Sequence, residues 1–350
     1  MAYTTINKSS DYFNTKLYTG TGSFPQSISG VGFQPDWVWI KRRNIAASHV
    51  LSDIIRGTTK TLYTDSTSAE LTSNTYGWVS AFGSDGFSVN QSGSNGENVN
   101  ASGSTYASWN WKANGAGSAN TDGTISSTVS VNTTAGFSIV KWVGTGSNAT
   151  IGHGLGVKPA MIITKPTSAV GSWYTYHKSL DATDFIKLNS TDATADNATI
   201  WNDTEPTTSV FTTGTAFDSG RTFIAYCFAD VTGYSKFGSY TGNGSSSSGT
   251  FIYTGFKPAW VLVKRTNASG NNWQMHDIKR TQYAQPINHR IAPNVDLVEQ
   301  TGDTLGFDFV SNGFRPNNNN ADYNGSGSTY IYMAFGQSIV GTNNIPATAR

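Results

Sequence analysis

The sequence predicts an all-β protein made of three tandem antiparallel β-sandwich domains of the jelly-roll type. A ten-residue phrase recurs about every hundred residues, at 32–41, 156–165 and 255–264, each time with glycine first, proline fourth and lysine last. Charged and aromatic residues each make up 13% of the chain, and its 37 glycines lie among runs of Ser, Thr and Asn. The spacing indicates three copies of one domain, and the composition is typical of β structure.

Each copy begins with a short apolar segment that runs into a glycine turn, at 16–22, 141–146 and 240–244, and we expect a first strand there. The proline of the recurring phrase cannot donate a hydrogen bond to a sheet, so it belongs at the beginning of a strand. After it nearly every residue is apolar in 37–41 and 260–264, which predicts a central strand buried on both faces. We expect the lysine that ends the phrase to mark the exit of this strand to solvent.

Two further strands are expected in each copy. The segments 173–178 and 273–278, with 48–51 as a looser match, predict the strand that pairs next. An alternating aromatic segment closes each copy, at 105–111, 222–228 and 329–335. His177 and His276 lie at the same distance after the proline of their copy, so we expect them to occupy one recurring position.

These elements divide the chain into six parts: an N-terminal segment 1–11, repeat 1 at 12–115, a linker or added hairpin at 116–135, repeat 2 at 136–232, repeat 3 at 233–338 and a C-terminal tail 339–350. Gly, Ser, Thr and Asn dominate the stretch between repeats 1 and 2, whereas repeats 2 and 3 adjoin directly. We therefore expect a stiff pair of domains joined to a more independent first domain.

The formal net charge is +1 and Lys and Arg are scattered singly, so we expect no nucleic-acid partner. The single cysteine, Cys227, cannot form a disulfide within the chain and is expected to be a small buried apolar residue. The N-terminus lacks the features of a cleaved signal peptide, and no apolar run approaches membrane-spanning length. We expect no membrane insertion, and synthesis in a bacterial cytoplasm followed by release as part of a particle.

No nucleophile elbow, phosphate loop, zinc pair or Cys-x-x-Cys occurs, so we expect neither enzyme activity nor a cofactor. His177 and His276 have no recurring ligand beside them and are expected to be structural rather than metal-binding. Calcium is a weaker alternative in repeat 2, where oxygen donors gather at 181–184, 192–196 and Asp203. Carboxylates that could cleave glycans lie in different turns of different copies: Asp53, Asp85, Glu97, Glu205, Asp218, Asp277, Asp303 and Asp308.

Aromatic residues are the remaining functional signal, because ten tryptophans and sixteen tyrosines exceed what three small cores need. Exposed Tyr and Trp beside Asn, Ser and Asp form stacking surfaces for sugar rings. The same residue types are enriched at subunit interfaces, so both interpretations stay open. Five candidates lie in polar, loop-like contexts: Tyr76, Trp78, Trp201, Tyr283 and Tyr323.

The recurring phrase, the closing aromatic strand and the ending at 344–350 resemble virion proteins of tailed bacteriophages, particularly those of marine and aquatic phages. The resemblance extends over all three repeats and carries no catalytic motif. The expected sandwiches are also similar, in fold alone, to concanavalin and laminin-G lectin modules.

The resemblance implies a structural and adhesive protein at the virion surface, a tail fibre or related appendage that attaches to the host, with surface glycan as the expected target. It also implies contacts with other virion proteins and a homo-oligomer, of which a trimer is the common form. Two alternatives stay open: a capsid decoration or head-fibre protein, and a depolymerase that cleaves surface polysaccharide.

Overall fold

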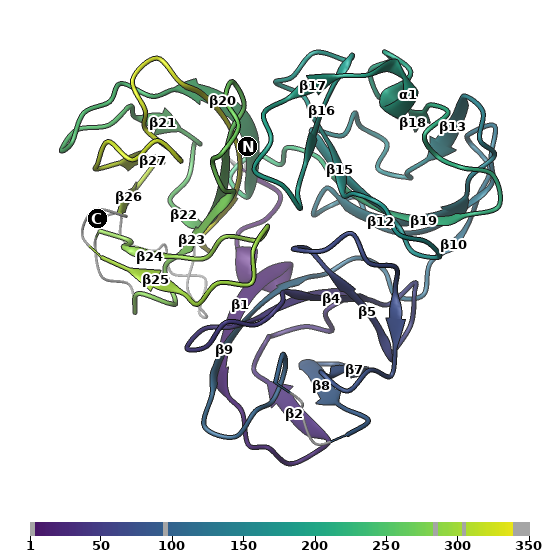
Figure 1. Cartoon of the computed structure of the whole chain (residues 1–350), viewed down its shortest axis with the longest axis horizontal. Helices are drawn as coiled ribbons and strands as arrows, with labels where there is room; N and C mark the ends of the chain where they lie inside the picture. Colours follow the sequence, from purple (N-terminus) through teal and green to yellow (C-terminus); the bar gives the residue numbers. More distant parts are fainter. Residues whose placement is uncertain (1–3, 94–96, 283–285, 303–305, 339–350) are drawn as a thin grey trace.

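The computed structural model of the chain describes residues 4–93, 97–282, 286–302 and 306–338. These residues lie almost entirely in strands and loops, with one short helix, α1 (Ala198–Trp201), and one 3-10 turn at Ser9–Asp11. None of their helices is long or apolar enough to cross a membrane. Figure 1 shows three lobes around a common centre, one for each repeat. The prediction of an all-β protein with antiparallel sandwiches is confirmed.

Sandwich 1 is formed by repeat 1. Its small sheet has the order β2 (Gln26–Ser29), β8 (Gly86–Asn90) and β7 (Trp78–Gly83). Val38 and Ile40 pack between the two sheets against Val79 and Phe87. Its large sheet has, in spatial order, β1 (Phe13–Thr19), β9 (Thr105–Trp111), β3 (Trp37–Arg42), β4 (Val50–Asp53), β5 (Lys60–Tyr63) and β6 (Leu71–Thr72).

Sandwich 2 is formed by repeat 2 and the stretch before it. The segment 116–135 contains β10 (Ser118–Asn120) and β11 (Ser127–Asn132), a hairpin that extends the large sheet at its edge. The layer opposite holds β13 (Ala149–Gly152), β18 (Val210–Thr213) and α1. The large sheet continues from β11 with β12 (Phe137–Val143), β19 (Thr222–Phe228), β14 (Met161–Pro166), β15 (Tyr174–His177), β16 (Asp184–Lys187) and β17 (Ala195–Asp196).

Sandwich 3 is formed by repeat 3. Its large sheet has the order β20 (Ser235–Thr241), β28 (Thr329–Gly336), β22 (Pro258–Arg265) and β23 (Gln274–Asp277). The facing sheet has the order β21 (Ile252–Tyr253), β27 (Gly313–Pro316) and β26 (Phe307–Val310), and a separate ladder joins β24 (His289–Arg290) to β25 (Gln300–Thr301).

The three large sheets share one topology. In each, the first strand of the repeat pairs with the closing aromatic strand, which pairs with the phrase strand, which pairs with the next strand along the chain. The predicted pairing of 173–178 and 273–278 beside the phrase strand is confirmed. The first and the closing strand of each repeat are therefore neighbours in one sheet, so each repeat forms its own large sheet.

The large sheets meet at the centre of the molecule and bury a shared core, which we call the central core. Side chains alternate along a strand, so Val38 of β3 enters sandwich 1 while Trp37 enters the central core. The prediction that Trp37 and Trp260 are buried is confirmed, since they are 1% and 0% exposed. The aromatic members of the central core come from all three repeats: Phe13, Trp37, Trp39, Trp109, Trp111, Phe137, Trp173, Tyr226, Phe228, Tyr234, Phe237, Trp260, Trp273 and Phe335.

Ring contacts in the central core join every pair of sandwiches. The ring of Trp37 stacks on that of Tyr226 with centroids 4.4 Å apart, and Trp111 meets Trp260 edge-on at 5.8 Å. Phe228 reaches Phe335 at 6.2 Å. The expectation of an independent first domain is therefore wrong, because an aromatic sheet face outweighs the flexible composition of the stretch at 116–135.

The two histidines do not share a position, which corrects the sequence prediction. His177 pairs with Met161 on β14, whereas the residue in the same place of sandwich 3 is Asp277, which pairs with Trp260. One additional residue separates the phrase from the next strand in repeat 3, and a shift of one residue turns a side chain to the opposite face of its sheet. His276 therefore packs on Phe307 inside sandwich 3, with ring centroids 4.5 Å apart.

The ring of sandwiches closes without a covalent link between sandwiches 3 and 1. Ser9 Oγ donates to the carbonyl of Gln337 at 3.2 Å, and the hydroxyls of Ser10 and Ser338 are 3.3 Å apart. Lys279 Nζ of sandwich 3 donates to Asn14 Oδ1 on β1 at 2.6 Å. The first and last parts of the described chain thus lie side by side.

Candidate functional site

The predicted aromatic candidates do not form one surface. Tyr76 is half exposed, as a ligand-binding aromatic requires. Trp78, Trp201 and Tyr323 are buried, so the expectation that they are exposed is wrong. Tyr283 lies outside the described residues. Polar neighbours misled the interpretation because alternate residues of a strand or turn face opposite ways.

Metal binding receives no support from the described residues. No group of three or more His, Cys, Asp or Glu side chains among them could hold an ion, the calcium candidates included. Burial lowers the pKa of His177 to about 4, and its Nε2 lies 3.1 Å from the carbonyl oxygen of Tyr332 in sandwich 3. This bond crosses the contact between sandwiches 2 and 3, and we call each contact between two sandwiches a junction. The neutral imidazole acts there as a structural hydrogen-bond donor. Cys227 is a buried free thiol.

The lysine that ends each phrase is fully buried, so the expectation that it leads to solvent is wrong. Its ammonium group reaches a carbonyl oxygen of the neighbouring sandwich, a partner that a single repeat does not contain. The same bond occurs at each junction: Lys41 to Asp296 at 3.1 Å, Lys165 to Thr67 at 2.9 Å and Lys264 to Thr191 at 3.3 Å.

Further hydrogen bonds recur at all three junctions. A side-chain ring at one position donates to a carbonyl of the neighbour: His49 to Ala292, Trp173 to Tyr63 and Trp273 to Lys187. A backbone amide of the neighbouring sandwich also donates to the carbonyl oxygen of the residue two positions after the lysine. These bonds run from Glu70 to Thr167, from Thr194 to Thr266 and from Glu299 to Arg43. The junctions are therefore geometrically equivalent around the ring, although their side chains differ.

Burial lowers the pKa of Lys41, Lys165 and Lys264 to about 8, against 10.5 for an ordinary lysine. Between these values the folded protein binds fewer protons than the unfolded chain, so stability rises with pH. We expect each lysine to add about 1 kcal/mol to the free energy of unfolding between pH 7.5 and 9. Denaturant titrations at several pH values measure it, and Lys165→Met should show a shallower rise than the native chain. An unchanged slope in that variant would contradict the assignment.

Two junctions contain a buried ion cluster. Between sandwiches 1 and 2, Arg56 pairs with Asp53 and, at 3.2 Å, with Glu70, while Tyr226 Oη donates to Asp53 at 2.8 Å. The charges are paired within one cluster, which is the condition under which burial of charge is tolerated.

Between sandwiches 3 and 1 the same positions hold Asp277, Arg280 and Glu299, and Trp109 Nε1 donates to Asp277 at 3.1 Å. Burial opposes ionisation of Glu299, but Arg280, with help from His289 and Arg43, lowers its pKa to about 2. The recurring Asp-x-x-Arg of 53–56 and 277–280 is visible in the sequence and could have indicated these clusters. At the junction between sandwiches 2 and 3 these three positions carry no charge, because they hold His177, Leu180 and Thr194.

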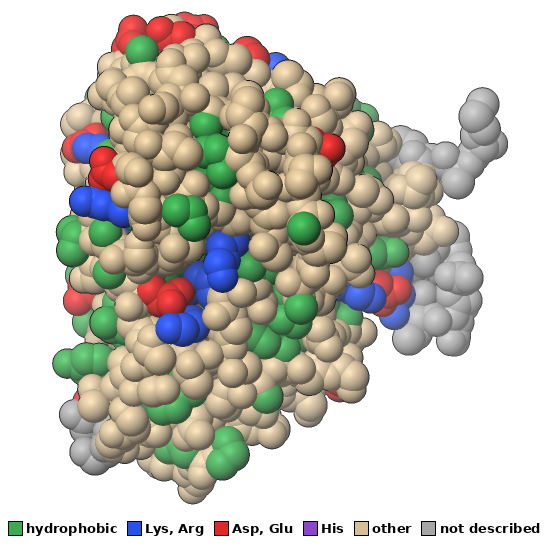
Figure 2. Space-filling view, turned by 90° about the vertical axis from the view of Figure 1, so that its right-hand side faces the viewer, with side chains coloured by type: hydrophobic (Ala, Val, Ile, Leu, Met, Phe, Trp, Pro, Cys, Tyr) green, Lys and Arg blue, Asp and Glu red, His purple; other side chains and the backbone are tan. Residues whose placement is uncertain are grey.

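A cleft of about 280 Å³ opens beside the cluster between sandwiches 1 and 2. Sandwich 1 contributes Arg56, Lys60 and Glu70, and sandwich 2 contributes Lys141, Thr167, Ser168 and Thr222. Figure 2 shows the side of the molecule that lies at the right of Figure 1, where the few charged side chains gather in small groups on a largely uncharged polar surface.

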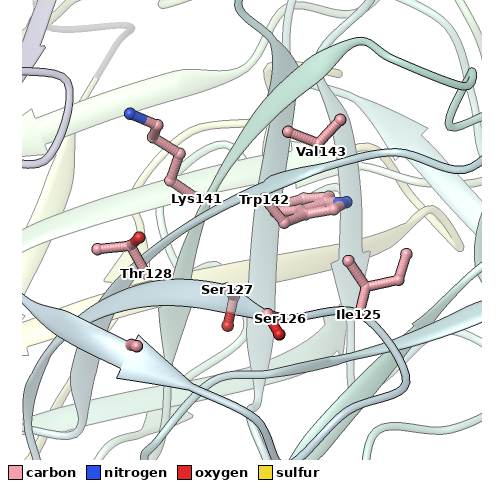
Figure 3. Close-up of a pocket in the computed structure, with 8 residues that line it drawn as sticks. Ile125, Ser126, Ser127, Thr128, Lys141, Trp142 and Val143 are labelled. Atoms are coloured by element: carbon pink, nitrogen blue, oxygen red, sulfur yellow. The ribbon is translucent and has the colours of Figure 1, made fainter.

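A second depression, of about 410 Å³, adjoins the cleft at Lys141, which lines both. Figure 3 shows Lys141 and Thr128 at one end of it and Ile125 with Val143 at the other. Along β12 the side chains of Phe137 and Ile139 enter the central core, Lys141 is half-buried and Val143 is half exposed. The cleft and the depression form one surface feature, which we call the junction groove.

The junction groove combines cations, hydroxyl groups and apolar contacts. Glu70 accepts from Arg56 at 3.2 Å and from Lys60 at 3.3 Å, and Asp53 pairs with Arg56 behind it. Among the described residues no carboxylate lies within ion-pair distance of Lys141. The groove therefore carries one excess positive charge and suits a polar ligand with an anionic group.

A family model described as a domain of unknown function, DUF7483, matches residues 8–338. The match runs through all three sandwiches. No curated protein and no solved structure matches the chain. Because the family model covers nearly the whole chain, the protein belongs to the DUF7483 family.

Proposed function

We propose that the protein is a structural and adhesive component at the surface of a tailed-phage virion, a tail fibre or related appendage that attaches to glycan on the host. The observation that carries this proposal is the closed ring, a preassembled unit whose cationic groove opens to solvent at one junction. A rigid unit with a shallow polar site is suited to attachment by many weak contacts. The resemblance of the recurring phrase to phage virion proteins agrees with this.

Avidity in this proposal comes from several copies of the chain on one particle. The three junctions of one chain differ, and a cleft with the groove's charges is found at the junction between sandwiches 1 and 2. Linked copies convert weak single contacts into stable attachment, which is the reason for proposing a homo-oligomer, with a trimer as the expected form.

A capsid decoration or head-fibre role is the second candidate. It is favoured by exposed apolar side chains at the junction of sandwiches 3 and 1, where Ile45, Leu297 and Val298 are 49%, 47% and 41% exposed. Ala47 and Asp296, which neighbour them in sequence, are joined by a backbone hydrogen bond of 2.8 Å. Such side chains suit contact with another virion protein.

The depolymerase alternative requires two carboxyl groups that face one groove. Glu70 lines the junction groove, and its oxygens are bound by Arg56 and Lys60. Asp53 is fully buried behind it in a pair with Arg56. New reducing ends released from host polysaccharide by the purified protein would favour this alternative over adhesion.

Electron microscopy of intact particles labelled with an antibody to this chain separates the candidates. Label at the tail is expected, and purified protein should then compete with particles for adsorption to cells. Label over the head would favour the decoration role instead. Normal adsorption of particles that lack the protein, or absence of the chain from particles, would overturn the adhesive proposal.

A further inference from the structure

We propose that the junction groove binds an acidic saccharide, with the carboxylate of a uronic acid-type sugar at Lys141 and Lys60 and the following sugar on the depression beside β12. This inference rests on the proposed attachment to glycan and names the class of glycan. Three features of the groove carry it: its excess positive charge, its hydroxyl-lined walls and its apolar far end.

The positive charge defines the anionic part of the ligand. Lys60 and Lys141 approach the cleft from different sandwiches, and Glu70 already shares its charge between Arg56 and Lys60. A ligand carboxylate that enters the cleft completes the charge balance and gains charge-assisted hydrogen bonds. A neutral sugar would leave the excess charge of Lys141 without a partner.

The walls define the rest of the ligand as polyhydroxylated. Thr167, Ser168 and Thr222 line the cleft, and Ser126, Ser127 and Thr128 line the depression. The hydroxyls of Thr167 and Ser127 donate within the protein, to the carbonyl oxygens of Thr222 and Gly152, so toward a ligand they act as acceptors of sugar hydroxyls. Ile125 and Val143 add an apolar surface suited to the C–H face of a sugar ring.

The corresponding junctions show why the cleft is open here. Between sandwiches 3 and 1, Arg43 stands in the place of Thr167, and its Nε donates to Glu299 at 2.8 Å, so the protein supplies its own cation there. Leu17 stands in the place of Lys141 in the same register of β1. Between sandwiches 2 and 3, Thr194 replaces the acid. At that junction Thr266 stands in the place of Thr167, and Ser239 stands in the place of Lys141. The combination of a short side chain at 167, the acid Glu70 and the cation Lys141 is thus particular to one junction.

The test is binding of a tetra-galacturonate to the purified full chain by isothermal titration calorimetry. Binding is expected to weaken with added salt and to be lost when the probe is fully methyl-esterified, which removes its charges. Lys141→Met is expected to weaken binding about tenfold, the loss of one charge-assisted contact. Thr167→Arg, which copies Arg43, should abolish binding by filling the cleft.

Lys236→Met is the matched control, because Lys236 is a half-buried lysine on the first strand of sandwich 3. Lys236→Met should bind the probe as tightly as the native chain does. All three variants should have the melting temperature of the native chain. Equal binding by Lys141→Met and the native chain, or equal binding of the esterified probe, would overturn the inference. Stronger competition by inorganic phosphate than by galacturonate would also overturn it and point to a phosphorylated ligand.

These outcomes separate the inference from the proposed function. If the protein blocks phage adsorption but does not bind galacturonate, the acidic-saccharide inference fails and attachment stands. If the groove binds galacturonate but the chain is absent from particles, attachment fails while the chemistry of the groove stands.

Discussion

Asp277→Asn is expected to lower the free energy of unfolding by about 3–5 kcal/mol, the effect of removing one partner from a buried ion pair. Asp277 is fully buried and accepts hydrogen bonds from Arg280, from Trp109 Nε1 and from the backbone amide of Lys279. Burial alone would lower the pKa of Arg280, but Asp277 and Glu299 raise it, so the guanidinium stays charged. In the variant this buried charge keeps Glu299 as its one acidic partner. Calorimetric melting of the variant measures the loss.

A rescue variant makes this expectation specific. Asp277→His combined with Arg280→Leu, Glu299→Thr and Arg43→Thr copies the neutral set that the junction between sandwiches 2 and 3 holds at 177, 180, 194 and 266. Arg43 is included because its guanidinium pairs with Glu299. Replacing a whole buried ion cluster is less costly than breaking it, so the quadruple variant should recover most of the lost stability. A single Asp277→Asn variant that melts with the native chain would show that the cluster contributes little.

Trp37→Ala is expected to destabilise the whole chain by about 3–5 kcal/mol, the usual effect of truncating a large buried aromatic residue. Trp37 contacts Trp111 of its own sandwich and Tyr226 of sandwich 2, with ring centroids 4.4 Å away in both cases. Because the lost contacts are shared, we expect a single melting transition at a lower temperature and not a separate early transition of sandwich 1.

Cys227 provides an independent readout of that cooperativity. It is the single cysteine of the chain and is buried in sandwich 2. If the sandwiches unfold together, Trp37→Ala in sandwich 1 should speed the reaction of Cys227 with a thiol reagent in sandwich 2. Trp142→Ala, which truncates the core of sandwich 2 itself, is the positive control. An unchanged labelling rate in Trp37→Ala would mean that sandwich 1 opens alone.

The local part of the fold could be predicted from the sequence. The phrase strands, their partners and the burial of Trp37 and Trp260 follow from proline placement and apolar runs. The burial of Lys41 could not be predicted, because the carbonyl oxygen of Asp296 that accepts its hydrogen bond lies in another repeat, far along the chain. The partners of a buried cation are a tertiary property that a local pattern does not contain.

The candidate site was harder to predict than the fold. The sequence predicted aromatic residues as the site, whereas the junction groove is lined chiefly by Lys, Arg, Ser and Thr side chains. Lys60 and Lys141 come from different repeats, and no local pattern marks residues that meet across a junction. Equivalent positions of the copies differ at the groove: repeat 2 has Thr167 where repeat 1 has Arg43, and Lys141 where repeat 1 has Leu17.

The covalent connection of the three repeats also changes how the molecule can vary. In a symmetric homotrimer every substitution appears at all three interfaces, so a change that opens a cleft at one interface weakens the other two as well. Here each junction has its own codons, and the shared hydrogen bonds of Lys41, Lys165 and Lys264 hold the ring while neighbouring positions differ. A single chain can therefore specialise one junction for a ligand and keep the other two for assembly.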